Sequence, residues 1–377
     1  MDRRTFFQTA AIGGGAAVAA GLGAITGAGA ARASTASAQG VAQSDPHITW
    51  NIFTRHLQWL TTEAEAVAHP YDTGVKVGEA AAEIGYTAVN PTIRRGGHVD
   101  PSQVDVRKNL PLFLDGVRST GVTCDFITTN IVDDTASIAT NNGQEVYAED
   151  LLAIARDEGI TRYRWGGFRY DEEEAFGPEI TAQLDAFQQQ IEGLAQLNER
   201  MGMTAVYHTH SSSGRGARSV WDLMHILSAY DPSQLAINFD IGHMTNQGTL
   251  SSWQTNLRYA MPYVSSVGLK DTKVFRKEDG TVESAWQQAG TGMVQWKKFF
   301  ELLLKGGFSG PGESHYEYDV VGLNGDVAVL NTTFWADHPQ FASGNLDREF
   351  MIKELSKDLV TYKTAARAAG WAPDQLT

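Results

Sequence analysis

The feature that most constrains the fold is a regular alternation of short strand-like runs with longer amphipathic stretches from about residue 47 onward. Eight apolar runs span residues 48–53, 87–91, 122–130, 161–165, 204–210, 235–240, 264–270 and 313–318. Helical periodicity marks the stretches 78–84, 109–119, 148–156, 180–200, 220–229, 253–260, 294–305 and 346–368. Glycines stand where helices should end, at Gly85, Gly121, Gly159, Gly202 and Gly306.

Such β-then-α units in one stretch favour a closed parallel barrel over an open, doubly wound sheet. An open sheet that binds a dinucleotide would carry a glycine-rich fingerprint after its first strand, and none follows residue 53. The predicted fold class is therefore α/β, a (β/α)8 TIM barrel, in one domain over residues 47–370. The segment 322–345 is longer than an ordinary loop and is predicted to be a lid, an interface element or a surface excursion.

Composition excludes some classes of partner. The chain has 377 residues and a formal net charge of −14 at pH 7, so it offers no broad positive surface for a nucleic-acid backbone. Its single cysteine, Cys124, cannot form a disulfide within the chain, and its apolar neighbours indicate a small residue in or beside a strand. We therefore expect a small-molecule partner and no nucleic acid, with the protein acting as a monomer or as a homo-oligomer.

Residues 1–38 differ in composition from the rest of the chain and have the order of an export signal. Arg3 and Arg4 precede a pair of phenylalanines, and an apolar run rich in alanine and glycine follows. This order resembles the twin-arginine signal, with cleavage expected after Ala38. The alternative is a retained membrane anchor, which the glycines disfavour because they make the run weakly apolar. The sequence predicts export by the twin-arginine pathway to the periplasm or the extracellular space, with no membrane span after cleavage.

The fifth predicted strand ends in two histidines, His208 and His210. In (β/α)8 barrels the active site lies at the carboxyl ends of the strands, so polar residues there are the first candidates. His208 and His210 share one face of the strand because side chains alternate with a period of two. They are predicted to hold one metal ion or to flank a substrate. The alternative is that both rings only donate hydrogen bonds to backbone carbonyls.

The sixth and seventh predicted strands end in charged residues. Asp240 closes an apolar strand three residues before His243, and a buried carboxylate needs a cation or several donors. The alternative role for Asp240 is to cap the following helix. Lys270 closes the seventh strand, where a lysine among carboxylates can donate a proton, stabilise an enolate or clamp a substrate. The alternative for Lys270 is a surface pair with Asp271.

The eighth predicted strand places Glu317 between two tyrosines. Glu317 is the natural carboxylate opposite Asp240 across the barrel mouth, and His315 shares its face of the strand. Polar and aromatic residues after the second and fourth strands are further candidates that could complete a sugar pocket, with ordinary rim residues as the alternative interpretation. These candidates are Arg94, His98, Trp165 and Arg169.

These strand ends carry a family resemblance. The motifs are Tyr-His-Thr-His at 207–210, Phe-Asp-Ile-Gly-His at 239–243, Val-Gly-Leu-Lys-Asp at 267–271, Gly-Thr-Gly at 290–292 and His-Tyr-Glu-Tyr at 315–318. Together they resemble the sugar phosphate isomerase/epimerase superfamily. This is the xylose isomerase-like TIM barrel family of AP endonuclease family 2 type, which includes inosose dehydratases and type IV apurinic endonucleases. The resemblance runs from about residue 48 to residue 320.

The resemblance implies a divalent metal ion, commonly Mn, Mg, Co or Zn, held by late-strand carboxylates and a histidine. By position, Asp240 and Glu317 match the carboxylate ligands. His208 or His210 stands at the fifth-strand position where many members have Glu, and His243 matches a histidine close to metal and substrate. The chain departs from the family at Gly268, where many members have a ligating histidine. Either the fifth-strand histidines complete the metal site, or the metal is weak or absent.

The resulting functional hypothesis is an exported, metal-dependent isomerase or epimerase of a sugar, cyclitol or keto-sugar that removes a proton next to a carbonyl. Glu317 or Lys270 is the predicted base, with His243 or His210 orienting a hydroxyl group. A dehydratase or lyase acting on a keto-sugar begins with the same proton abstraction and is the close alternative. A non-catalytic carbohydrate-binding barrel is the second alternative, motivated by Gly268. The export signal and the acidic charge disfavour DNA repair at abasic sites.

Overall fold

A computed structural model describes residues 45–170, 176–211, 218–248, 252–322, 327–329, 335–338 and 346–377. Residues Gln43–Thr377 cluster as one compact unit. The predicted export signal at residues 1–38 lies outside the described residues. Within the described ranges, no helix is both long enough and apolar enough to cross a bilayer.

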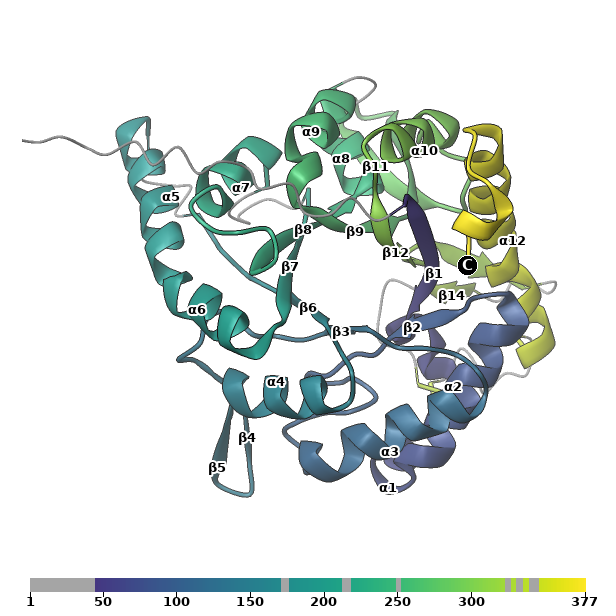
Figure 1. Ribbon diagram of the computed structural model, residues 1–377. Coiled ribbons are helices and arrows are strands. Elements are labelled where there is room, and N and C mark those ends of the chain that lie inside the picture. The colour runs from purple at the N-terminus through teal and green to yellow at the C-terminus, as the bar shows by residue number, and fades with distance from the viewer. Residues whose placement is uncertain are drawn as a thin grey trace, which may run out of the picture. The chain divides into compact units, whose positions relative to one another are not determined.

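Eight parallel strands form a ring at the centre of this unit (Figure 1). They are β1 (His47–Phe53), β2 (Ala88–Asn90), β3 (Phe126–Thr128), β6 (Arg162–Trp165), β7 (Thr204–His208), β8 (Leu235–Asp240), β9 (Val264–Leu269) and β12 (Ser309–Ser314). The hydrogen-bonded order is β2-β1-β12-β9-β8-β7-β6-β3, so β12 returns to pair with β1, and β2 and β3 are the two ends of the sheet. Between β2 and β3, the amide of Thr128 donates to the carbonyl oxygen of Pro91 at 2.8 Å, next to a bridge between Thr92 and Thr128. The predicted (β/α)8 TIM barrel is confirmed.

Helices cover the outside of the ring (Figure 1). The α-helices are α1 (Glu63–Ala68), α2 (Pro70–Ile84), α3 (Val106–Ser119), α4 (Ala148–Asp157), α5 (Pro178–Gln190), α6 (Glu192–Met201), α7 (Val220–Leu227), α8 (Ile241–Gly248), α9 (Ser252–Ala260), α10 (Trp296–Lys305) and α12 (Arg348–Ala368). Short 3-10 helices are η1 (Thr54–Leu60), η2 (Met261–Tyr263) and η3 (Pro373–Gln375). The predicted single helix over 180–200 is wrong, because the chain turns at the buried Ile191. This break lets α5 pack beside α7 while α6 packs beside α4 and β7.

The core lies inside the ring and between the ring and the helices. Trp50, Phe126 and Phe239 come from three strands and are fully buried, and burial of each such side chain is worth about 2 to 3 kcal/mol. The helix α2 ends at Gly85, whose φ of 108° is a left-handed conformation that favours glycine. The predicted role of this glycine as a helix stop follows from that geometry.

Two strands end earlier than predicted, and two candidate site residues therefore lie in loops after the strands. The fifth strand ends at His208, so His210 lies beyond it. The eighth strand spans Ser309–Ser314 rather than 313–318, and Glu317 therefore lies in the loop after the strand. Glycine and proline at its centre lowered the apparent strand propensity. Close packing explains one of them, since a Cβ at Gly312 would lie 3.0 Å from Ile48 Cγ2.

Within the part of the chain that the structure describes, three antiparallel hairpins were not predicted. They are β4 (Ser137–Asn141) with β5 (Gln144–Tyr147), β10 (Asp271–Arg276) with β11 (Val282–Gln287), and β13 (Asp319–Val321) with β14 (Val327–Val329). The β10–β11 hairpin begins directly after Lys270, so it rises from the carboxyl end of β9. From the predicted long segment 322–345, Trp335 is buried and its ring lies 5.5 Å from the His98 ring. Most of that segment lies outside the described residues.

The carboxyl-terminal residues pack on the first strand. Trp371 is buried, and the amide of Thr377 donates to the carbonyl oxygen of Ile48 at 3.0 Å. In return, the amide of Trp50 donates to the carbonyl oxygen of Thr377 at 2.7 Å. The compact unit thus continues past residue 370, where the sequence placed the end of the domain.

Candidate functional site

Charged side chains from the last strands converge at the carboxyl end of the barrel. His208 ends β7, Asp240 ends β8, and Lys270 directly follows β9. Glu317 follows β12 by three residues. His208, Asp240 and Lys270 are buried, whereas the side chain of Glu317 keeps 17% of its surface exposed. Parallel strands that end at one edge bring together residues more than one hundred positions apart in the chain.

Lys270 lies at the centre of this cluster. Its Nζ is 2.9 Å from Glu317 Oε1 and 3.3 Å from Asp240 Oδ2. The same atom is 2.9 Å from His243 Nε2 and 4.3 Å from the centre of the Trp286 ring. Lys270 therefore bridges the two carboxylates that the resemblance assigns to a metal, and it is not a surface partner of Asp271.

Asp240 has two roles at once. Its Oδ1 accepts a hydrogen bond from the amide of His243 at 2.9 Å, so it caps the start of α8 as the alternative interpretation proposed. Its Oδ2 lies 3.2 Å from His208 Nε2 and 3.3 Å from Lys270 Nζ. Burial raises the pKa of Asp240, while the positive charge of Lys270 opposes that shift. The ion pair with Lys270 is what makes a carboxylate at this buried position tolerable.

His243 is held from both sides. The backbone amide of Ser211 donates to His243 Nδ1 at 3.1 Å, and the Ser211 hydroxyl lies 2.8 Å from the same atom. Its Nε2 faces Lys270. Burial, and after it the charge of Lys270, holds the pKa of His243 well below its usual range, so the ring is neutral at pH 7.

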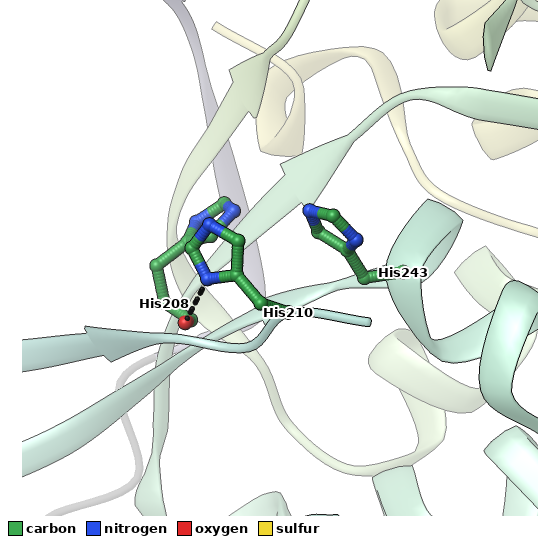
Figure 2. Close-up of side chains that lie close together, drawn as sticks. All are labelled: His208, His210 and His243. Carbon is green, nitrogen blue, oxygen red and sulfur yellow. Dashed lines mark hydrogen bonds between the residues drawn. The ribbon is translucent and has the colours of Figure 1, made fainter. Parts of the chain in front are cut away.

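His208 and His210 lie beside His243, as Figure 2 shows. Ring centres of His208 and His210 are 4.6 Å apart, and those of His210 and His243 are 4.7 Å apart. His210 Nδ1 lies 2.9 Å from the carbonyl oxygen of His208, and its Nε2 lies 3.3 Å from a guanidinium nitrogen of Arg164. Burial, followed by Arg164, holds the pKa of His208 well below its usual range.

A second buried group beside Glu317 consists of Glu313, which sequence reasoning missed, and His315, which it had named as a candidate. Glu313 accepts hydrogen bonds from Asn90 Nδ2 and, at 2.9 Å, from Asn238 Nδ2. His315 Nε2 lies 2.9 Å from Glu313 Oε2, and His315 Nδ1 lies 3.5 Å from Glu317 Oε1. Burial alone would lower the pKa of His315, but the charge of Glu313 and hydrogen bonds to both carboxylates raise it. The raised pKa favours the imidazolium form of His315 between the two carboxylates.

The charge of Glu317 is stabilised by its neighbours. Burial alone would raise the pKa of Glu317, but Lys270 and His315 outweigh that effect and hold it well below its usual range. Glu317 also lines a cavity of about 590 Å³ together with Trp286, Gln288 and Tyr318. Ligand pockets typically measure about 300 to 1,000 Å³. Of the cluster around Lys270, Glu317 is the carboxylate that faces this cavity.

The predicted substrate-binding residues lie in different surroundings. His98 is buried against Phe113 and Trp335, and burial lowers its pKa to about 3. Arg94 lies 6.0 Å from the centre of the Phe53 ring, which stacks on His315. Arg94 is thus connected to the cluster through one aromatic ring.

Trp165 and Arg169 are less closely tied to the cluster. Trp165 packs on the rings of Phe168 and Tyr207 in the barrel wall, and Arg169 is exposed. Sequence reasoning missed Glu313, although it lies on the same face as His315 by the period of two, a signal that could have identified it. Trp286 gave no such signal, because only the β10–β11 hairpin brings it over Lys270.

A divalent metal does not fit the predicted ligand set as it lies here. The ligand atoms of two described groups, His208 with His210 and His243, and His208 with Glu313 and His315, lie within 4.8 Å of one another. In the first group the outward nitrogens of His210 and His243 face Arg164 and Lys270. In the second, His315 is shared between carboxylates. Lys270 Nζ already lies 2.9 Å from Glu317 Oε1 and 3.3 Å from Asp240 Oδ2, so a divalent ion would have to displace this ammonium to reach both carboxylates.

Comparison with known proteins places this site in a family. Residues 79–326 match the family described as the xylose isomerase-like TIM barrel. The chain belongs to this family. An inosose dehydratase of Lacticaseibacillus casei is 24% identical in an alignment 139 residues long that covers 33% of this chain and 45% of that enzyme. The chain therefore matches less than half the length of that curated member of the superfamily.

Solved xylose isomerase-like barrels share the fold over most of the chain. A D-psicose 3-epimerase from Clostridium cellulolyticum H10, solved with D-tagatose, has a TM-score of 0.53 and 11% identity, covering 85% of this chain and 99% of its own. A xylose isomerase-like barrel from Mycobacterium smegmatis in complex with magnesium has a TM-score of 0.51 and 14% identity, covering 83% of this chain and 98% of its own. At these identities the likeness shows the fold.

Proposed function

We propose that this protein is a sugar-modifying enzyme that isomerises or epimerises a sugar, cyclitol or keto-sugar by removing a proton next to a carbonyl group. The observation that carries the proposal is the contact of Lys270 Nζ with Glu317 Oε1 at 2.9 Å, beside a cavity that Glu317 lines together with residues of β11, β13 and α12. A carboxylate next to a fixed cation is the pair that such proton abstraction needs. The epimerase and dehydratase relatives support the same class of reaction.

In the proposed reaction Glu317 is the base. It is the carboxylate of the cluster that lines the cavity, so a substrate C–H group can reach it. In the protein without substrate, the positive charge of Lys270 stabilises the ionised form of Glu317 and lowers its pKa. When a substrate carbonyl oxygen takes a hydrogen bond from Lys270, Glu317 loses part of that stabilisation and becomes a stronger base. Lys270 then stabilises the enediolate oxygen as its negative charge develops.

The surrounding histidines have separate tasks in this proposal. His243 and His210 lie beside Lys270 and Arg164 and orient a substrate hydroxyl group. His315 keeps Glu317 in place through its Nδ1. The sequence-based prediction of a divalent metal is supported by the magnesium complex of a related barrel. The cations already present around Asp240 and Glu317 argue against it, so no step of the proposed reaction uses a metal.

A lyase is the second candidate, and one observation favours it. His315 lies between Glu313 and Glu317, which raise its pKa, so it is the candidate proton donor beside the base Glu317. Elimination from a keto-sugar needs this combination, because the leaving oxygen must be protonated after the neighbouring proton is removed. The inosose dehydratase relative catalyses a reaction of this class.

Proton abstraction can be tested without knowing the product. A panel of ketoses, keto-sugars and inososes is incubated with the protein in D2O, and deuterium incorporation next to the carbonyl is followed by NMR. Replacing Glu317 by Gln is expected to reduce the exchange rate by at least about 100-fold, as general-base catalysis contributes about 10² to 10⁴. Glu354→Gln is the matched control, because Glu354 lines the same cavity but lies on α12.

Two results would count against the proposal. Exchange at the wild-type rate in the Glu317→Gln variant would remove Glu317 as the base. Tight binding of a sugar with no exchange in the wild-type protein would favour the non-catalytic carbohydrate-binding barrel instead.

We also propose that residues 1–38 direct export by the twin-arginine pathway. The support is the order of Arg3, Arg4, the apolar run and Ala38 in the sequence. These residues lie outside the described part of the structure. An exported enzyme would meet unphosphorylated sugars, so the proposed substrate class carries no phosphate.

A further inference from the structure

We propose that Lys270 is the resident cation of this site and takes the position that a divalent metal holds between the carboxylates of metal-dependent relatives. The inference concerns the same site as the proposed function and rests on it only for the substrate class. It is carried by contacts of Lys270, by two glycines that make room for it, and by the balance of charges around it.

The contacts of Lys270 are those of a bridging cation. Its Nζ lies 3.3 Å from Asp240 Oδ2 and 2.9 Å from Glu317 Oε1, so one ammonium joins the two predicted ligands. The lysine is 2% exposed, and the Trp286 ring lies 4.3 Å above its Nζ. Two carboxylates and an aromatic face therefore surround one charge in a site largely shielded from water.

Gly268 makes room for the carboxylate of this pair. A Cβ built at Gly268 would lie 2.8 Å from Asp240 Oδ2 and 3.0 Å from Asp240 Cβ. Any side chain there, including the histidine that the resemblance leads us to expect, would push Asp240 away from Lys270. The absence of that histidine is thus coupled to the presence of the ion pair.

Gly242 makes room for the lysine. A Cβ at Gly242 would lie 2.6 Å from Lys270 Cγ and 2.7 Å from the Lys270 carbonyl oxygen. The side-chain stem of Lys270 therefore passes directly over the first turn of α8. Gly268 on β9 thus leaves space for Asp240, and Gly242 on α8 leaves space for Lys270. The backbone at these two positions accommodates both partners of the ion pair.

The charges around the pair leave little place for an added divalent ion. Among the described residues, Asp240, Glu313 and Glu317 are the carboxylates of the cluster. Lys270 contacts two of them, Asp240 and Glu317, and His315 lies between Glu313 and Glu317. Further positive charge comes from Arg164, which acts on Glu313, and from Arg55, which interacts with Glu317. Two more positive charges would be added to carboxylates that already have cationic partners.

The proposal is tested by metal binding, which does not depend on turnover. The purified wild-type protein is treated with a chelator and titrated with Mn²⁺ and Zn²⁺ by calorimetry, and a Lys270→Ala variant is titrated in parallel. We expect no stoichiometric binding to the wild-type protein. The variant is expected to bind one ion per chain at least 10-fold more tightly, because Asp240 and Glu317 are then left without their cation.

Thermal unfolding gives a second measurement on the same proteins. Mn²⁺ is expected to raise the Tm of Lys270→Ala and to leave the wild-type Tm unchanged. Lys273→Ala is the control, because Lys273 lies exposed on the neighbouring β10 strand, and it should behave as the wild-type protein. If Lys270→Ala does not fold, the wild-type titration alone decides.

One divalent ion bound per wild-type chain, with affinity equal or weaker in Lys270→Ala, would overturn the proposal. Failure of the proposed reaction looks different. A wild-type protein that binds no metal and also exchanges no substrate proton would support the resident cation while removing the assigned activity.

Discussion

At the scale of single residues, the site depends on buried charges that are tolerable only as a group. Glu313 is fully buried and contacts His315 Nε2 at 2.9 Å, while His315 also faces Glu317. Removing one member of such a group leaves a buried charge without its partner. The free-energy cost of that unpaired charge exceeds the net free energy that the intact ion pair contributes to folding. The same reasoning applies to Lys270 between Asp240 and Glu317.

Glu313→Gln is therefore expected to destabilise the protein by about 3 kcal/mol, since breaking one partner of a buried ion pair typically costs about 3 to 5 kcal/mol. The glutamine keeps the shape and one acceptor for Asn90 or Asn238, but it removes the charge that faces His315. Urea denaturation at pH 6 measures the change. Glu301→Gln is the control, because Glu301 forms solvent-exposed pairs on α10, which are worth about 0 to 1 kcal/mol. Equal stability of wild type and Glu313→Gln would contradict the assigned ion pair.

Most residues of the cluster could be predicted from the sequence, but the contacts between their side chains could not. His208, Asp240, His243, Lys270 and Glu317 were all selected because they end or follow predicted strands, and the structure brings them together. Their pairing could not be predicted, because it depends on how far each side chain reaches across the ring.

At the scale of elements, strand and helix order was predictable because each unit carries its own hydrophobic period. The eighth strand was misplaced because Gly310, Pro311 and Gly312 weaken the local strand signal. The β10–β11 hairpin was missed because most of its residues are exposed and its apolar residues, among them Phe275 and Val282, have no core-facing pattern, although it places Trp286 over Lys270. Elements stabilised by contacts with the site are harder to predict than those stabilised by the core.

The helix α12 carries a buried carboxylate that makes stability depend on pH. Asp358 Oδ1 accepts hydrogen bonds from the Tyr318 hydroxyl at 3.0 Å and from the Ala289 amide at 3.2 Å. Burial raises the pKa of Asp358 from 3.8 to about 7. The folded state therefore favours the protonated form. Stability from this group is fully present below about pH 4 and is lost as the pH rises toward 7.

Asp358→Asn is expected to raise the free energy of unfolding at pH 8 by roughly 3 to 4 kcal/mol, because a shift of about three pKa units corresponds to about 4 kcal/mol. The variant should also lose the decline in stability between pH 4 and pH 7. Denaturant unfolding across this range measures both effects, with the exposed Glu349→Gln on the same helix as control. A variant less stable than the wild-type protein at pH 8 would show that the ionised Asp358 is well accommodated.

At the scale of the whole molecule, the barrel places the candidate site residues together at the carboxyl ends of its strands. The predicted export signal concerns a separate property, the compartment in which the protein acts. The family and the fold are shown by the match over residues 79–326 and by the ring of parallel strands. The formation of a homo-oligomer stays a prediction. The twin-arginine signal also stays a prediction, and it can be tested on the full-length chain.

Replacing Arg3 and Arg4 together by Lys keeps the charge but removes the twin-arginine pair. The double variant is expected to accumulate in the cytoplasm, whereas the wild-type protein is recovered outside it with an amino terminus near residue 39. Cell fractionation and mass spectrometry of the purified protein measure both outcomes. Arg32→Lys is the control, since Arg32 lies outside the pair. Export of the double variant at the wild-type level would contradict the signal.

Deuterium exchange catalysed by chelator-treated wild-type protein tests the central claim most directly, because it reports proton removal by the Glu317–Lys270 pair without an added metal. Each sugar is followed by NMR in D2O before and after chelator treatment and again after addition of Mn²⁺. We expect exchange next to the carbonyl of at least one substrate, at the same rate in all three conditions. Exchange that disappears with the chelator and returns with Mn²⁺ would contradict this view of the site, and no exchange with any sugar would contradict the proposed reaction.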